Sequence, residues 1–146
     1  MIDKKWIGHE LPDSVMTIER SRLQFFAKAI GETNPVYTDL AAARSAGYAD
    51  LPAPPTFLFG AELDSGASDR LVADLGIPFA NLLHGEQRFT YHHPACAGDK
   101  VTVRSKVTDV YAKKGGALEF VVKSSRATNE AGVLLAEMCT VLVYRH

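Results

Sequence analysis

The chain has 146 residues, of which 47% are hydrophobic and 23% charged, a balance typical of a globular domain and not of a disordered or fibrous segment. Its 16 Lys and Arg residues nearly balance 17 Asp and Glu residues, giving a formal net charge of -1, and no basic block that would bind a phosphate backbone is present. This composition argues against nucleic acid as a main partner. At this length one core can hold the fold without a disulfide or a metal.

The ends of the sequence and its thiols predict the compartment. The N-terminal sequence MIDKKWIGHE lacks the apolar region of a signal peptide, and the most apolar late stretch, VLLAEMCTVLVY, is too short for a membrane span and contains Glu137. Cys96 and Cys139 show no motif spacing, which indicates two reduced thiols. We therefore expect a cytoplasmic protein without a membrane segment. Because Gly and Pro are scattered and no repeat is present, residues 1–146 are expected to form a single domain.

The first half of the chain predicts helices. Caps, helix-stopping glycines and apolar residues at helical spacing indicate four of them: from the cap Thr17 to Gly31, from the cap Asp39 to Ala46, the stretch TFLFGAELD after Pro54-Pro55, and from the cap Ser68 to Leu75. The third helix is apolar nearly all round. It is therefore expected to be buried.

After residue 80 the pattern changes to that of a sheet. Side chains alternate from Glu86 to His93, and three more strands are predicted at about 100–111, 117–128 and 133–144, joined by turns at 113–116 and 129–132. An antiparallel meander is the simplest connection. The last strand is apolar on both faces, so it is expected to lie centrally, with one face on a helix and the other available to a second subunit. The predicted class is α+β, with an antiparallel sheet wrapped around a central helix.

Several ordered motifs resemble those of the MaoC-type (R)-specific enoyl-thioester hydratases and dehydratases, in particular their N-terminal, FAS1-like subfamily. The segment FFAKAIGETNPVY at residues 25–37 resembles their hydratase 2 motif, and the further matches are Gly47-Tyr48, Ala53-Pro54-Pro55-Thr56-Phe57, Leu83-His84-Gly85-Glu86-Gln87, Tyr91-His92-His93-Pro94, Ala97-Gly98-Asp99 and Asn129-Glu130-Ala131-Gly132. The resemblance implies a hot-dog dimer that holds an acyl thioester of CoA or acyl carrier protein beside its central helix. It also implies reversible syn addition of water across the 2,3 double bond, without a cofactor.

The sequence departs from the family pattern where the chemistry is expected. In catalytic members the resemblance implies an Asp, a His five residues later, and a Gly N–H at the start of the central helix. Here Glu32 stands at the Asp position and Tyr37 at the His position, and a phenol with a pKa of about 10 is a poor base at neutral pH. Pro54 and Pro55 have no N–H, so the amide of Thr56 or Phe57 would have to polarise the thioester carbonyl.

The candidate catalytic residues are Glu32, Tyr37 and His84, of which His84 opens a strand and is the side chain best suited to proton transfer. Each also has an ordinary structural interpretation, as a solvated acid, a half-buried aromatic and a strand-end histidine. The candidate substrate-binding residues are Asn34, Pro55, Thr56, Phe57 and Phe59. No metal is expected, because alternation sends His92 and His93 to opposite faces of their strand and no ligand set is completed.

Three functions are compatible with these residues. The first is an active homodimeric hydratase with altered catalytic groups. The second is a subunit that shapes the acyl pocket while a partner chain supplies the intact Asp and His, as in the heterodimeric hydroxyacyl-ACP dehydratases whose degenerate subunit this chain resembles. The third is a hot-dog thioesterase that uses Glu62 or Asp64 on the central helix. Departures at independent catalytic positions indicate a lost role, so we favour the second.

Overall fold

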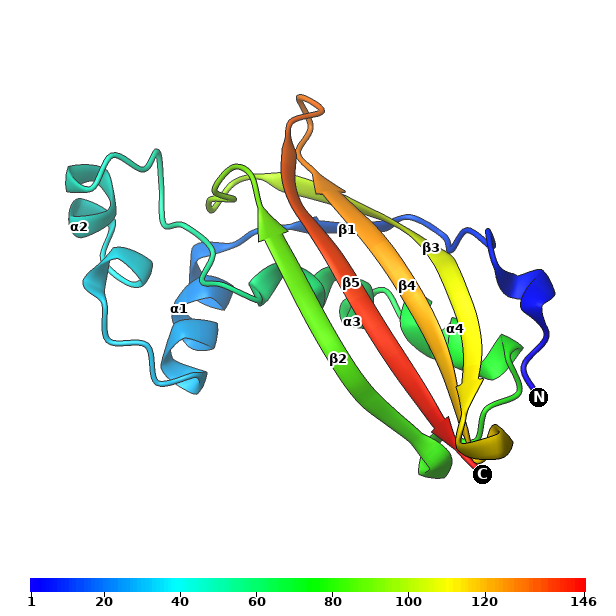
Figure 1. Ribbon diagram of the computed structural model, residues 1–146. Coiled ribbons are helices and arrows are strands. Elements are labelled where there is room, and N and C mark those ends of the chain that lie inside the picture. The colour runs from blue at the N-terminus through cyan, green and yellow to red at the C-terminus, as the bar shows by residue number, and fades with distance from the viewer.

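A five-stranded antiparallel sheet, in the order β1-β3-β4-β5-β2, forms the frame of the computed structural model, which describes residues 1–146. Figure 1 shows this sheet curling around the short helices α3, Gly60–Asp64, and α4, Ala67–Asp74. The predicted α+β class and the sheet around a central helix are thereby confirmed. The strands are β1 Ser14–Thr17, β2 Leu82–Tyr91, β3 Lys100–Lys113, β4 Leu118–Thr128 and β5 Leu134–Arg145.

Two further helices, α1 at Arg20–Ala29 and α2 at Leu40–Ser45, lie beyond one end of the sheet (Figure 1). Short 3-10 turns connect the elements at Lys4–Trp6, Pro35–Tyr37, Phe57–Phe59, Phe79–Asn81 and Lys114–Gly116. None of the helices combines the length and the apolar run that crossing a bilayer requires. The four predicted helical regions are all present, and their boundaries are shifted where tertiary contacts compete with local caps.

Two predicted caps are wrong for that reason. Thr17 lies in β1, where it pairs with Lys100, and α1 begins at Arg20. Ser68 lies inside α4, and its hydroxyl accepts a hydrogen bond from Lys123 Nζ at 2.9 Å. The cap at Asp39 is confirmed, because its carboxylate accepts the N–H of Ala42 at 2.7 Å.

The predicted meander is correct for three strands and wrong for the fourth. β3, β4 and β5 follow one another as antiparallel neighbours, whereas β2 pairs with β5 at the far edge instead of with β3. The connection between β2 and β3 makes this possible, because it leaves the sheet and bonds to the segment before the central helix. There Ala53 N–H donates to Ala95 O at 2.7 Å, and Ala97 N–H donates to Leu51 O at 2.8 Å. The central position predicted for the last strand is confirmed.

The core consists of two apolar clusters, of 16 and 9 buried residues, separated by a polar layer. Along β3, Val103 belongs to the larger cluster and Val107 to the smaller, with Ser105 between them. The central helix brings Glu62 into this layer, where the residue is only 1% exposed, while Leu63 is 53% exposed. The helix predicted to be buried thus buries one face and exposes Leu63, because hydrogen bonds from the sheet satisfy the buried carboxylate.

Candidate active site

The segment that resembles the hydratase 2 motif forms a tight loop between α1 and α2. Gly31 ends the helix with a φ of 71°, a left-handed conformation that glycine adopts readily. Asn34 then accepts the N–H of Val36 at 3.1 Å and starts the 3-10 turn Pro35–Tyr37. This turn buries Val36 in the larger apolar cluster, and Tyr37 packs against that cluster. The loop is thus held rigidly enough to fix the position of the tyrosine.

Glu32, the residue at the expected acid position, turns back to its own backbone. Its Oε1 accepts the N–H of Thr33 at 2.9 Å and of Asn34 at 2.8 Å. These bonds stabilise the turn after α1, and Glu32 does not line the cavity described next. The carboxylate is therefore engaged by the loop and lies outside the lining of this cavity.

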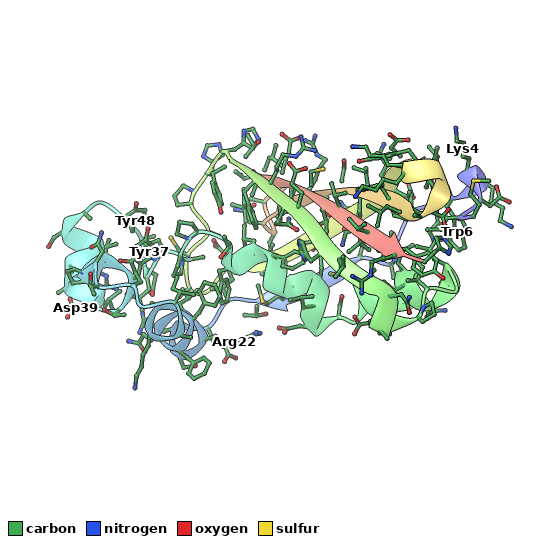
Figure 2. All side chains as sticks on the ribbon, turned by 60° about the horizontal axis from the view of Figure 1, so that its bottom comes forward. Lys4, Trp6, Arg22, Tyr37, Asp39 and Tyr48 are labelled. Carbon is green, nitrogen blue, oxygen red and sulfur yellow. The ribbon has the colours of Figure 1, made fainter.

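A cavity of about 280 Å³ lies where this loop meets the start of the central helix and the end of β2. Tyr37 and Tyr48 lie side by side at this end of the molecule, opposite the end that carries Trp6 (Figure 2). Hydroxyl groups and apolar surface dominate the wall, because the lining residues are Tyr37, Tyr48, Pro52, Ala53, Pro54, Pro55, Leu58, Tyr91, His92, His93, Pro94 and Ala95. No carboxylate is among them, so the cavity suits a ligand that accepts hydrogen bonds.

Tyr37 is a hydrogen-bond donor in this cavity. Burial raises the pKa of its phenol above the ordinary value, and the negative charge that Tyr48, Glu32 and Tyr91 carry when ionised raises it further. The phenol is therefore protonated throughout the neutral range and does not supply a base.

The two backbone amides expected to polarise a carbonyl are already bonded within the chain. Thr56 N–H donates to the Tyr91 hydroxyl at 2.8 Å, and Phe57 N–H donates to Pro54 O at 3.1 Å. Thr56 has a φ of 76°, which is unusual for a β-branched residue and marks a strained turn of the kind often found at binding sites. Sequence reasoning included Tyr91 in the motif Tyr91-His92-His93-Pro94 but did not propose it as a site residue, although the alternation of β2 places it on the same face as Phe89.

The remaining candidates lie elsewhere. Phe57 is 5% exposed and packs edge-to-face on Phe26 with ring centroids 5.4 Å apart, whereas Phe59 packs on His84 at 5.5 Å. Neither phenylalanine lines the cavity, and the residue between them, Leu58, does. His84 stands seven residues before Tyr91 on β2, about 23 Å away at the usual rise of a strand. The structure thus brings Tyr37, Pro55 and the Thr56 amide together and leaves His84 outside this group.

The acids of the thioesterase hypothesis do not reach the cavity either. Glu62 accepts Ser105 Oγ at 2.6 Å and Lys123 Nζ at 2.5 Å inside the core, and it also accepts the hydroxyl of Ser125. Asp64 lies on the surface, paired with Arg22 at 2.7 Å. Neither carboxylate is placed to activate water beside a thioester in the tyrosine-lined cavity.

A larger cavity of about 650 Å³ opens on the sheet face that points away from the central helix. Two of its arginines are paired with carboxylates of the same wall, Arg104 with Asp13 at 3.1 Å and Arg126 with Glu137 at 3.0 Å. It contains none of the predicted site residues.

The structure holds no group of three His, Cys, Asp or Glu side chains arranged to bind a metal ion. His92, one of the two histidines considered for such a site, has its Nε2 atom 3.0 Å from Glu137.

Comparison with known proteins supports the family predicted from the motifs. Residues 5–138 match the family model described as "FAS1-like, dehydratase domain region". A UPF0336 protein of Streptomyces avermitilis is 35% identical over 147 residues, covering 99% of this chain and 95% of that protein.

Two solved structures share the fold. The Mycobacterium tuberculosis HadBC (3R-hydroxyacyl-ACP dehydratase) complex matches with a TM-score of 0.82 and 26% identity over 98% of this chain and 99% of that chain. The (R)-hydratase of A. caviae matches with a TM-score of 0.70 and 20% identity over 93% and 94%. Together with the sheet curled around a central helix, these matches show that the chain belongs to the FAS1-like dehydratase family of MaoC-like hot-dog proteins.

Proposed function

We propose that this chain binds an acyl thioester of CoA or acyl carrier protein in the tyrosine-lined cavity and works as the non-catalytic subunit of a (3R)-hydroxyacyl-thioester dehydratase. The observation that carries this proposal is the placement of Glu32 and Tyr37, the residues at the expected Asp and His positions of the family pattern. Glu32 is bonded to its own loop outside the cavity, and Tyr37 is a protonated phenol, so the two expected positions present no base to a ligand in the cavity. The partner would supply the acid and base.

The chemistry of the wall supports a thioester as the ligand. The phenols of Tyr37, Tyr48 and Tyr91 offer hydrogen-bond donors to a carbonyl oxygen, and Pro55 and Leu58 offer apolar surface to the start of an acyl chain. A cation would find no carboxylate here to neutralise its charge. The cytoplasm is the compartment that suits the proposal, because it keeps the two free thiols reduced.

The edge of β2 is the surface proposed for the partner subunit. This ten-residue strand is the last in the sheet order, so one of its edges has no neighbour within the chain, and most of its residues are exposed. An unpaired strand edge is a template for a strand of another chain. β2 also carries Tyr91, so a partner that pairs here would lie next to the cavity. The HadBC neighbour, which is described as a complex, supports a second hot-dog subunit as this partner.

A second function is favoured by one observation. His93 lines the same cavity and forms no salt bridge within the chain, and an imidazole is the side chain that most often acts as a general base. In an active homodimer His93 would take the proton from water, while Tyr37 would donate to the substrate.

The experiment measures hydration of a short enoyl-CoA, followed by loss of conjugated-enone absorbance, with the chain alone and with a co-expressed MaoC-like chain. We expect slow or no turnover by the chain alone and rapid turnover by the mixture. The double variant Tyr37→His, Glu32→Asp should raise the rate of the chain alone toward the 10²–10⁴-fold that a positioned base contributes. The control variant Tyr48→His, Glu32→Asp should not, because it places the imidazole at position 48 of the cavity wall instead of at the expected base position 37.

Rapid turnover by the purified chain alone would refute the partner role, and its loss in His93→Gln would establish the homodimeric enzyme instead. Release of free CoA without addition of water would show thioesterase chemistry. Failure of the chain to bind any acyl thioester, alone or in the mixture, would refute the proposal as a whole.

A further inference from the structure

Tyr91 occupies the place where a substrate carbonyl would otherwise meet the backbone. Two prolines precede Thr56, so the Thr56 amide is the first N–H of this turn, and it donates to the Tyr91 hydroxyl at 2.8 Å. The next amide, that of Phe57, is bonded to Pro54 O. A carbonyl entering the cavity therefore finds the tyrosine hydroxyl in front of the amide.

The hydroxyl is available as a donor in this arrangement. A phenol has one hydrogen to give and two lone pairs that accept. The Tyr91 oxygen accepts from Thr56, and within this chain its own hydrogen is given to no protein atom. A hydroxyl that accepts one hydrogen bond becomes a stronger donor for the next, because the bonds in such a chain polarise one another.

The position of this hydroxyl is fixed by the strand that carries it. The ring of Tyr91 stacks on that of Phe89 with centroids 5.7 Å apart and an angle of 2° between the planes. Phe89 in turn packs against the larger apolar cluster. Tyr91 as a residue is 51% exposed, so its hydroxyl is held at the cavity by the stacking and remains open to a ligand.

We infer that Tyr91 donates the hydrogen bond to the thioester carbonyl, in a chain that runs from the Thr56 N–H through the Tyr91 hydroxyl to the carbonyl oxygen. This inference rests on the proposed function and names the group that would hold the substrate's reacting carbonyl. In this chain a side-chain phenol thus takes the place of a backbone amide. The unusual φ of Thr56 is found at the residue whose amide starts this chain of hydrogen bonds.

The test uses a short enoyl-CoA labelled with carbon-13 at the thioester carbonyl. Binding is measured by titration, and the carbonyl stretch by isotope-edited infrared spectroscopy, for the chain alone and for its complex with a MaoC-like partner. In the wild type the stretch should move to lower frequency on binding. In Tyr91→Phe that shift should be lost and the affinity should fall about two- to tenfold, as expected for one neutral hydrogen bond.

Tyr111→Phe is the matched control. Tyr111 is also stacked on a phenylalanine, Phe120, with centroids 4.7 Å apart, and it lies outside the cavity. This variant should keep both the shift and the affinity. A thermal melt establishes that both variants fold. In addition, carbon-13 at the ζ position of tyrosine in the wild type should report a change at Tyr91 when the thioester binds, a measurement that needs no variant.

Two outcomes separate this inference from the proposed function. If the wild type binds the thioester and Tyr91→Phe keeps the carbonyl shift, or the Tyr91 signal does not respond to binding, Tyr91 is not the donor and the inference is overturned while the proposed function stands. If neither the wild type nor its complex binds the thioester, the proposed function fails and the inference fails with it.

Discussion

Removing the charge of Glu62 should destabilise the protein strongly, because it leaves an ammonium group buried without a counter-ion. Both Glu62 and Lys123 are 1% exposed, and their charged atoms are 2.5 Å apart. Breaking a buried pair from one side costs about 3–5 kcal/mol. Since domains of this kind are stable by roughly 5–15 kcal/mol, Glu62→Gln should lose a large part of the total and lower the Tm by roughly 10 °C.

Replacing both partners should recover most of that loss. In the double variant Glu62→Leu, Lys123→Met no charge is left in the core, and apolar residues of similar size often match or exceed the stability of a buried ion pair. The Ser105 hydroxyl, which donates to Glu62 in the wild type, can then donate to Ser125 Oγ, 2.9 Å away. We therefore expect the double variant to lie within about 2 kcal/mol of the wild type.

An exposed pair on the same helix provides the control. Asp64 pairs with Arg22 at 2.7 Å, and their side chains are 47% and 43% exposed. Such pairs contribute about 0–1 kcal/mol, so Asp64→Asn should have little effect. Urea unfolding followed by circular dichroism gives the free energies. A loss of less than about 1 kcal/mol in Glu62→Gln, or a double variant no more stable than Glu62→Gln, would refute the reasoning.

Two further predictions concern the backbone and the pH dependence. Thr56→Gly should stabilise the protein by up to about 1 kcal/mol, because glycine adopts the φ of 76° without the cost that a β-branched residue has there, and a lower Tm would contradict this. The hydrogen bonds from Arg20 to Asp50, at 2.6 and 2.8 Å, lower the pKa of that carboxyl to about 2. Because the folded state binds this proton more weakly than the unfolded state, the stability that Asp50 contributes is present above pH of about 4 and is lost as the pH falls through about 2. The Tm of Asp50→Asn should therefore change less with pH between these two values than the Tm of the wild type. Equal slopes of Tm against pH would contradict the assignment.

The sequence predicts the local elements well, because their signals are local. The alternation from Glu86 to His93 and the turns at 113–116 and 129–132 are properties of neighbouring residues, and the corresponding strands are present. The Asp39 cap is likewise a contact over three residues. The caps at Thr17 and Ser68 fail because each side chain has a distant alternative, in a strand or with a lysine of the sheet.

The sequence by itself also determined the family and the departure from its chemistry, because the order of motifs and the identities at Glu32 and Tyr37 are properties of the chain. Only the tertiary structure decided where these groups point. It joins Tyr91 to the Thr56 amide across 35 positions and Glu62 to Lys123 across 61, and it places β2 beside β5 instead of β3. Such contacts depend on how strands pair and how a helix lies against them, and residue periodicity specifies the face of an element without specifying its neighbour.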